Sequence, residues 1–479
     1  MSYNHGIRVD ELATKVPEPS ITKSGIIVAI GTAPVNTAKN PAVNQLVYAK
    51  NYAEAVEALG YSEDFENYTL CQVIYTAFKK AKVAPVVFIN VLDPATHKTE
   101  LEETTLTVIA KQTTLDVLGV CLDSLKVLNG AEELTQGTDY IATFDDDSKV
   151  LITLLDTTKT TSCTSIKVSG SKLNPSAVTS TDVIGGYDEE TGIETGLELV
   201  RQVFPKFGVF PGTLIAPGYS ENKNVAAVMD AKSTNINGAY SCMNIIDIST
   251  ETAKKYTDVE STKTNAGIFS RQTIAVWPMV KMGKKIVAYS ALLAAIAQKN
   301  DYENDDVPAN PSNKELGIDG LVLKDGTEVV LDEEQANTLN AIGVVTAVNF
   351  DGFKSWGNNT ACYPSTTDPK DRWIGCRRFF VWWENNFILK YHKKVDANAG
   401  YKTIEAIVDA ENIKGNSYVA EGKCAGAYIE FIQSENPMAN ILDGHVKFRM
   451  HLAPYTPAED ILNVFEFDVD ALETELGGI

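Results

Sequence analysis

The stretch GIIVAIGTAPVNTAKNPAVNQLVYAKNYAEAVEALG, residues 25–60, decides the fold class. Its first seven residues form an apolar run bounded by glycines, which is typical of a strand buried on both faces of a sheet. A helical pattern at 52–60 ends in glycine, a longer one covers 68–82, and a second apolar strand pattern follows at 83–92. Strand and helix patterns in turn predict a helix-covered, mostly parallel sheet.

The same alternation returns after residue 186 and continues to residue 305, but the segment between interrupts it. Residues 96–182 are rich in threonine and contain only two aromatic residues, Tyr140 and Phe144. Short alternating patterns there, including a hairpin that turns at 145–148, predict an antiparallel β domain inserted into the α/β domain. Its scarcity of aromatic residues indicates a peripheral module.

The last third of the chain is rich in aromatic residues, and residues 368–394 predict a long helix with one buried face. The expected fold class is an α/β core with a helix-covered, mostly parallel sheet, an inserted antiparallel β domain, and an α+β C-terminal domain with extended terminal strand arms. The expected division is an N-terminal arm at 1–20, an α/β domain at 21–95 and 186–305, the inserted β-rich domain at 96–185, an α+β core domain at 306–460 and a C-terminal strand arm at 461–479.

Charge and hydropathy exclude several classes of protein. The 479 residues include 42 basic and 63 acidic ones, and the resulting net charge of −21 repels nucleic acid. The longest apolar runs fall far short of the ~20 residues that a membrane-spanning helix needs, and the first residues lack a secretory signal pattern. We therefore expect no nucleic-acid partner, no membrane anchoring, and synthesis and folding in a cytoplasm.

Signatures of catalysis and of cofactor binding are absent from the sequence. It contains no GxxxxGK[ST] loop, no GxGxxG turn after a strand, no GxSxG elbow and no HExxH helix. The turn at 31–34 carries a proline that removes a backbone donor, so we expect a structural turn there, and we expect Ser220 or Asn222 to cap a helix. The seven cysteines lack zinc-binding spacing. We expect no enzyme, no cofactor and no metal site.

Both ends of the chain carry alternating patterns that predict strands. Residues 445–452 place His445, Lys447, Arg449 and His451 on one face, and Val446, Phe448, Met450 and Leu452 on the other. Residues 461–470 place the acidic Glu466, Asp468 and Asp470 opposite Phe465, Phe467 and Val469. These two strands either form an internal hairpin or pair between subunits. Near the start, Ile7 and Val9 alternate with Arg8 and Asp10, which predicts a short arm that needs an edge strand elsewhere.

These features together resemble the contractile tail sheath proteins of bacteriophages and of related phage-tail-like bacteriocins. The resemblance lies in the arm GIRVDE at 6–11, the strand and GTAP turn that lead to the helix at 52–60, the helix and strand at 68–91, the run ANTLNAIGVVTAVNFDGFKSWGNNT at 336–360, the helix that contains Arg377 and Arg378, and the segment 436–469. It covers most of the chain and is weakest in the predicted insertion.

The resemblance implies a structural subunit that polymerises around a tail tube and contracts to drive the tube through a bacterial envelope. Its implied partners are further copies of itself, the tail tube protein, and the baseplate and tail terminator proteins, and it implies assembly in the bacterial host cytoplasm. It also implies that terminal arms add strands to neighbouring subunits. The expected interface residues are Ile7, Val9, Val446, Phe448, Met450, Phe465, Phe467 and Val469, and the candidate electrostatic contacts are Arg377, Arg378, Lys447, Arg449, Glu466 and Asp468. A type VI secretion sheath component and an α/β enzyme remain the alternatives.

Overall fold

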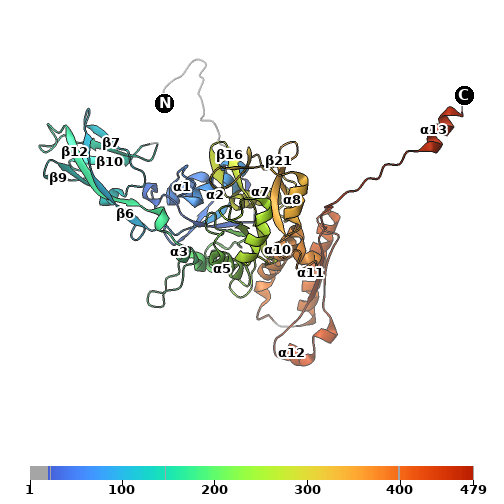
Figure 1. Ribbon diagram of the computed structural model, residues 1–479. Helices are drawn as coiled ribbons and strands as arrows, with labels where there is room; N and C mark the ends of the chain where they lie inside the picture. The colour runs from blue at the N-terminus through green and yellow to red at the C-terminus, as the bar shows by residue number, and fades with distance from the viewer. Residues whose placement is uncertain (1–19, 22, 146, 398–399, 478–479) are drawn as a thin grey trace, which may run out of the picture.

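The computed structural model describes residues 20–477 apart from residues 22, 146 and 398–399 (Figure 1). An eight-stranded sheet at its centre has the order β21-β20-β15-β14-β13-β2-β5-β3. The six inner strands run parallel, and the two edge strands run antiparallel to their neighbours. The strands are β2 Ile27–Gly31, β3 Leu46–Ala49, β5 Val86–Asn90, β13 Thr213–Ile215, β14 Met243–Asp247, β15 Thr273–Val276, β20 Val344–Asn349 and β21 Phe353–Trp356.

The apolar runs that opened the sequence form the middle of this sheet. Every residue of β2 is buried, as is every residue of β5, because helices cover the sheet. The helix α7 (Tyr289–Glu303) is buried on nearly all sides and packs on β13 and β14 together with α5 (Lys223–Ser233). The other helices of this region are α1 Tyr52–Leu59, α2 Thr69–Ile74 with a wider π-helical continuation at Tyr75–Ala81, α3 Ser180–Ile184, α4 Val203–Phe207, α6 Val259–Ala266 and α8 Glu333–Asn340.

Two smaller sets of strands attach to this core. Strand β1 (Ser20–Ile21) pairs in parallel with β4 (Val83–Ala84). A four-stranded antiparallel sheet has the order β17-β16-β18-β19, with β16 at Met279–Met282, β17 at Lys285–Val287, β18 at Gly320–Val322 and β19 at Glu328–Val329. The predicted boundary at 305 differs from the structure, because β20 and β21 lie beyond that residue and still complete the central sheet.

The segment predicted as an insertion forms two antiparallel sheets that protrude from one side of the molecule (Figure 1). Their orders are β10-β11-β7 and β6-β12-β8-β9, and they enclose a hydrophobic cluster of their own around Tyr140, Ile152 and Val168. The predicted hairpin is present, with Phe144 opposite Val150. The strands are β6 Lys98–Thr107, β7 Gln112–Leu115, β8 Lys126–Asn129, β9 Glu132–Leu134, β10 Tyr140–Phe144, β11 Val150–Leu154 and β12 Ser165–Leu173. Strands β6 and β12 leave and rejoin the core side by side, where the backbone N–H of Asn174 donates to the His97 carbonyl at 2.9 Å. The predicted end of the insertion at 185 differs from the structure, because α3 comes after this crossing and packs on the core through Val183.

The C-terminal region packs two long helices against a two-stranded sheet. The predicted long helix is present as α9 (Pro369–Arg372) and α10 (Ile374–Tyr391), and α11 (Tyr401–Ala420) packs on β22 (Gly426–Glu430). Strand β23 (Arg449–Ala453) pairs antiparallel with β22, and the connection between them contains α12 (Met438–Leu442). The chain ends in α13 (Val469–Leu476), which stands clear of the body in Figure 1.

The structure contradicts two predictions for the chain ends, and a third lies outside the described residues. The internal hairpin between 445–452 and 461–470 is wrong, because β23 pairs with β22 and begins only at Arg449. The predicted strand at 461–470 is also wrong within this single chain, since residues 454–468 pair with no described strand and a helix begins at Val469. Ile7 and Val9 lie outside the described residues.

Candidate subunit interface

The final segment of the chain exposes apolar side chains to solvent along its whole length. Phe465 is 89% exposed, and no hydrogen bond or ion pair joins residues 461–477 to the rest of the described chain. The other exposed apolar residues are Ile461, Leu462, Val464, Phe467, Val469, Leu472 and Leu476. Contiguous apolar exposure of this kind marks a surface that another molecule covers.

The same segment is strongly acidic. Residues 454–479 contain no lysine, arginine or histidine, and their acidic residues are Glu459, Asp460, Glu466, Asp468, Asp470, Glu473 and Glu475. We call residues 461–477 the C-terminal arm. Its partner must offer apolar surface and a positive or neutral field, because an acidic partner would be repelled.

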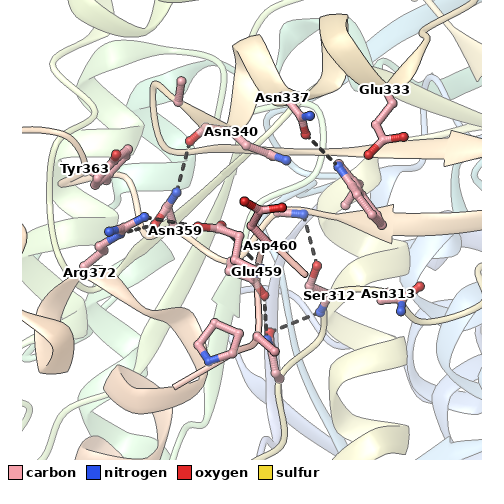
Figure 2. Close-up of a pocket in the computed structure, with 17 residues that line it drawn as sticks. Ser312, Asn313, Glu333, Asn337, Asn340, Asn359, Tyr363, Arg372, Glu459 and Asp460 are labelled. Atoms are coloured by element: carbon pink, nitrogen blue, oxygen red, sulfur yellow. Dashed lines mark hydrogen bonds and ion pairs between the residues drawn. The ribbon is translucent and has the colours of Figure 1, made fainter. Parts of the chain in front are cut away.

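The arm is anchored at its base by Arg372 and by Asn358, whose side-chain amide donates to Glu459 at 3.5 Å (Figure 2). The guanidinium of Arg372 donates to the Glu459 carboxylate at 3.2 Å and to the Asn359 side-chain oxygen at 2.8 Å. It also stacks on the rings of Trp373 and Tyr363. Glu459 closes one side of an asparagine-rich cavity of about 460 Å³ between α8, β21 and α9. The chain is therefore fixed as far as Glu459, and the arm begins directly after that anchor.

Strand β22 cannot accept a further strand along most of its outer edge. The side-chain amide of Asn412 on α11 donates to the Ile429 carbonyl at 3.1 Å and accepts from the Ile429 N–H at 2.8 Å. Gly415 of the same helix lies so close that a Cβ there would be 1.9 Å from the Ala427 carbonyl oxygen. Helix α11 thus covers this edge and satisfies its backbone groups.

The opposite edge of the sheet, along β23, is open among the described residues. Because the backbone of Ile429 bonds to Asn412, the antiparallel pair of Ile429 and Met450 is not a hydrogen-bonded one. Backbone groups alternate in direction along a strand, so those of Met450 and Leu452 point outward. Sequence reasoning identified 445–452 as an acceptor but could not find the blocked edge, which depends on two side chains of α11.

The two faces of β23 differ in the way the sequence predicted. Met450 and Leu452 pack against the aromatic cluster of Phe379, Trp383 and Trp382. On the other face, Lys447 and Arg449 both pair with Glu435, and His451 lies 2.9 Å from Glu430. Val446 and Phe448, just before the strand, are half-buried.

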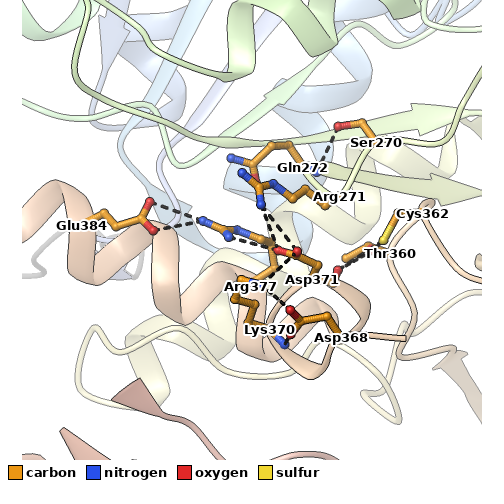
Figure 3. Close-up of polar contacts among 10 residues, drawn as sticks. All are labelled: Ser270, Arg271, Gln272, Thr360, Cys362, Asp368, Lys370, Asp371, Arg377 and Glu384. Carbon is orange, nitrogen blue, oxygen red and sulfur yellow. Dashed lines mark hydrogen bonds and ion pairs between the residues drawn. The ribbon is translucent and has the colours of Figure 1, made fainter. Parts of the chain in front are cut away.

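Arg377 and Arg378 on α10 were expected to make electrostatic contacts between subunits, but both are buried within the subunit. Arg377 and Arg378 are only 4% and 5% exposed, because α10 buries this face against the core. Arg378 forms a bidentate ion pair with Asp301 of α7, with Nη1–Oδ1 at 3.0 Å and Nη2–Oδ2 at 2.5 Å. Arg377 contacts Asp371 and Glu384, and Figure 3 shows Arg271 and Lys370 gathered around the same Asp371. Both arginines therefore serve internal contacts.

The turn after β2 and the residues Ser220 and Asn222 have structural roles. The backbone N–H groups of Thr32 and Ala33 donate to the side chains of Thr69 and Asn90, so the turn after β2 is filled by its own neighbours. The Ser220 hydroxyl donates to the buried carboxylate of Asp247. Of the two residues predicted as N-caps, Asn222 caps α5. Within the described ranges, no cluster of metal-binding side chains occurs and no helix is long and apolar enough to cross a bilayer.

Comparison with known proteins shows similarity over the whole chain, although no family model matches it. The tail sheath protein of Burkholderia phage BcepMu is 24% identical over 490 residues, which cover 100% of this chain and 99% of that protein. The major tail sheath protein of Serratia phage KSP20 is 23% identical over 343 residues, 65% of this chain and 78% of that one. A putative prophage major tail sheath protein of Pseudomonas aeruginosa is 29% identical over 184 residues, 37% and 45% of the respective chains.

Solved structures show the same fold. A chain in the cryo-EM structure of the anti-feeding prophage baseplate superposes with a TM-score of 0.58 at 15% identity, covering 98% of this chain and all of that one. A chain of the contracted PVC sheath complex, from an extracellular contractile injection system, gives 0.58 at 12% identity and covers 98% and 99%. The curated relatives are structural proteins and not enzymes. Sequence similarity along the full length identifies this chain as a homologue of phage tail sheath proteins, and the two solved chains share its fold.

Proposed function

We propose that this chain is the structural subunit of a contractile tail sheath, which polymerises around a tail tube and contracts to drive the tube through a bacterial envelope. The observation that supports this most directly is a mismatch within one subunit. The apolar, acidic C-terminal arm has no partner among the described residues of its own chain, and β23 presents an edge that is open among those residues, with an apolar face and a basic face.

The arm and the edge complement each other in both faces when they come from different subunits. Phe465 and Phe467 of the arm extend the face that Met450 and Leu452 present to the aromatic cluster, while Glu466 and Asp468 meet the face of Arg449 and His451. Burying one phenylalanine side chain contributes about 1.5–3 kcal/mol, so two of them stabilise each junction substantially. The backbone of Met450 and Leu452 gains hydrogen-bond partners at the same time.

The length of the arm sets the distance between connected subunits. Asp468 lies nine positions after Glu459, and an extended chain spans about 3.3 Å per position. The acceptor edge therefore lies within about 30 Å of the Arg372 anchor of the donor subunit. The partners of the assembled polymer are further copies of this chain, a tail tube protein, and baseplate and tail terminator proteins, and we place its assembly in the bacterial host cytoplasm and its final location in a virion tail or a phage-tail-like particle.

Phe467→Asp tests the proposal. In the monomer the Phe467 side chain is 75% exposed, so the variant should unfold at close to the same urea concentration as the parent protein. In the polymer the new carboxylate would be buried at the junction, which is costly for an unpaired ion. We expect sedimentation and negative-stain microscopy to show long tubes from the parent chain and none from the variant.

Ile109→Asp is the matched control, because Ile109 is also highly exposed but lies in the peripheral sheets. This control variant should still form tubes. Normal tubes from Phe467→Asp would contradict the trans pairing of the arm. A purified parent protein that stays monomeric at every concentration and salt level would contradict the sheath function as a whole.

A further inference from the structure

Two exposed apolar patches remain after the arm and the acceptor edge are matched. One is a stripe on α13 formed by Val469, Leu472 and Leu476, whose spacing of three and four residues places them on one helix face. The other lies on α12, where Met438 is 64% and Leu442 is 80% exposed. Neither patch has a partner among the residues that the structure describes.

The direction in which an arm adds to β23 follows from the charges. In the extended part of the arm, residues 461–468, the acidic residues Glu466 and Asp468 lie at the C-terminal end, and further acidic residues follow in α13. Near β23 the basic residues Lys447 and Arg449 lie at its N-terminal end, where both pair with Glu435 and Glu430 lies opposite Arg449 on β22. An antiparallel arm brings these two ends together, whereas a parallel arm places its acidic end beside the uncharged Ala453 and Pro454.

Antiparallel addition also decides where α13 lies. The helix starts directly after the strand portion of the arm, so it emerges beyond the N-terminal end of β23. The chain enters β23 at that end from α12, and the buried side chain of Asn436 ties the two together by bonding both the N–H and the carbonyl of Lys447. Met438 and Leu442 therefore lie at the end of the sheet that α13 reaches.

The two patches lie apart within the described subunit. The arm leaves the body at the Arg372 anchor and extends away, while α12 lies at the opposite end of the C-terminal region (Figure 1). We propose that the arm adds antiparallel to β23 of a second copy of this chain, and that α13 then docks its Val469, Leu472 and Leu476 stripe on α12 of that same copy. The inference rests on the proposed trans pairing of the arm and adds its orientation and a second point of attachment.

Covalent trapping in the full-length polymer distinguishes the orientations. Leu472→Cys combined with Leu442→Cys should give reducible ladders of covalent oligomers on non-reducing gels, because docking brings the two positions within disulfide reach. Leu472→Cys with Glu421→Cys should give none, because Glu421 precedes the opposite end of the sheet, where Gly426 pairs with Ala453. Leu472→Cys alone controls for the native cysteines, all of which are buried or half-buried.

A third pair separates failure of this inference from failure of the proposed function. Phe465→Cys with Met450→Cys, joined by a short bismaleimide, reports pairing of the arm with β23 in either direction. Ladders from this pair and from the Glu421 pair, but not from the Leu442 pair, would establish parallel addition and overturn the inference. Ladders from the strand pair alone would show that α13 does not dock. Polymers that give ladders from none of the three pairs would overturn the trans pairing itself.

Substitution of the helix face gives an independent readout. Leu472→Asp should leave the unfolding of the monomer unchanged and raise the protein concentration needed for polymerisation about tenfold, which corresponds to about 1.4 kcal/mol. Thr474→Asp is the matched control, because Thr474 lies on the opposite face of α13, and it should polymerise like the parent chain. Equal effects of the two variants would show that charge and not the apolar stripe is responsible, and would overturn the docking of α13.

Discussion

Arg378→Met should destabilise the subunit more than any surface charge change, because it breaks the ion pair that joins α10 to α7. Asp301 is fully buried, and its carboxylate accepts two hydrogen bonds from the Arg378 guanidinium and one from the backbone N–H of Ala309. Burial raises the pKa of Asp301, while the charge of Arg378 opposes that rise. Removing the arginine leaves the carboxylate buried without a counter-charge.

The expected size of this effect is about 3–5 kcal/mol, which is the cost of removing one partner of a buried pair. The carbonyl of Ala309 also loses its bond from Arg378, at 2.6 Å, and an unsatisfied buried acceptor costs about 1–3 kcal/mol. The two losses share one site and are not additive, so about 4 kcal/mol is a reasonable expectation. The double variant Asp301→Asn with Arg378→Met should recover part of this loss, because it removes the uncompensated charge.

Urea unfolding followed by tryptophan fluorescence measures the change directly, since α10 carries Trp382 and Trp383. Lys324→Met is the control, because its partner Glu251 is exposed and surface pairs contribute about 0–1 kcal/mol. A loss below about 1 kcal/mol for Arg378→Met would refute the reasoning, as would a double variant less stable than Arg378→Met alone.

Three further predictions concern the periphery, the charge and the pH dependence. Replacing residues 98–173 by a short Gly–Ser bridge should leave a folded, assembling protein, because His97 and Asn174 are hydrogen-bonded neighbours; loss of folding in circular dichroism would contradict this. Light scattering should show faster association in moderate salt and weaker polymers in high salt, since subunits of charge −21 repel one another and the Debye length is about 10 Å at 0.1 M; indifference to salt would contradict it. Burial raises the pKa of Glu221 from 4.5 to about 7, so its contribution to stability should fall as the pH rises through that window; Glu221→Gln should flatten this part of the urea-unfolding profile, and an unchanged profile would contradict the assignment.

The central fold was predictable because its signals are local. The apolar runs at 25–31 and 83–92 contain β2 and β5, and the Asp-rich turn after Phe144 marks the hairpin of β10 and β11. In each case neighbouring residues carry the whole pattern. The predicted domain boundary at 305 was wrong because β20 pairs with β15 and so belongs to the central sheet. No local sequence pattern reveals that pairing.

The candidate interface was predictable only in part, because it depends on contacts distant in sequence. Arg377 and Arg378 were expected as candidate electrostatic contacts between subunits, but Asp301 lies 77 residues before its partner Arg378, and no sequence pattern connects them. The alternation of 461–470 predicted a strand through Val469, yet Asp468 caps a helix there by accepting from the N–H of Ala471. A period of two and a spacing of three and four overlap at this junction, so the sequence supports either structure.

In the proposed polymer, the arrangement of anchor, arm and acceptor would let connected subunits change their packing without separating. The anchor at Arg372 and the acceptor edge on β23 belong to one folded body, since α10, α11 and the two-stranded sheet share one aromatic cluster. In this proposal the extended chain after Glu459 runs between bodies, and it has no regular hydrogen bonds of its own before α13. Rotation of one body against the next then changes backbone dihedral angles in this segment, which costs little, and leaves the paired ends intact. If the proposed sheath contracts, the free energy released would therefore come from the faces of the rigid bodies, while the proposed pairing of the arms would keep each subunit within about 30 Å of its neighbour's anchor.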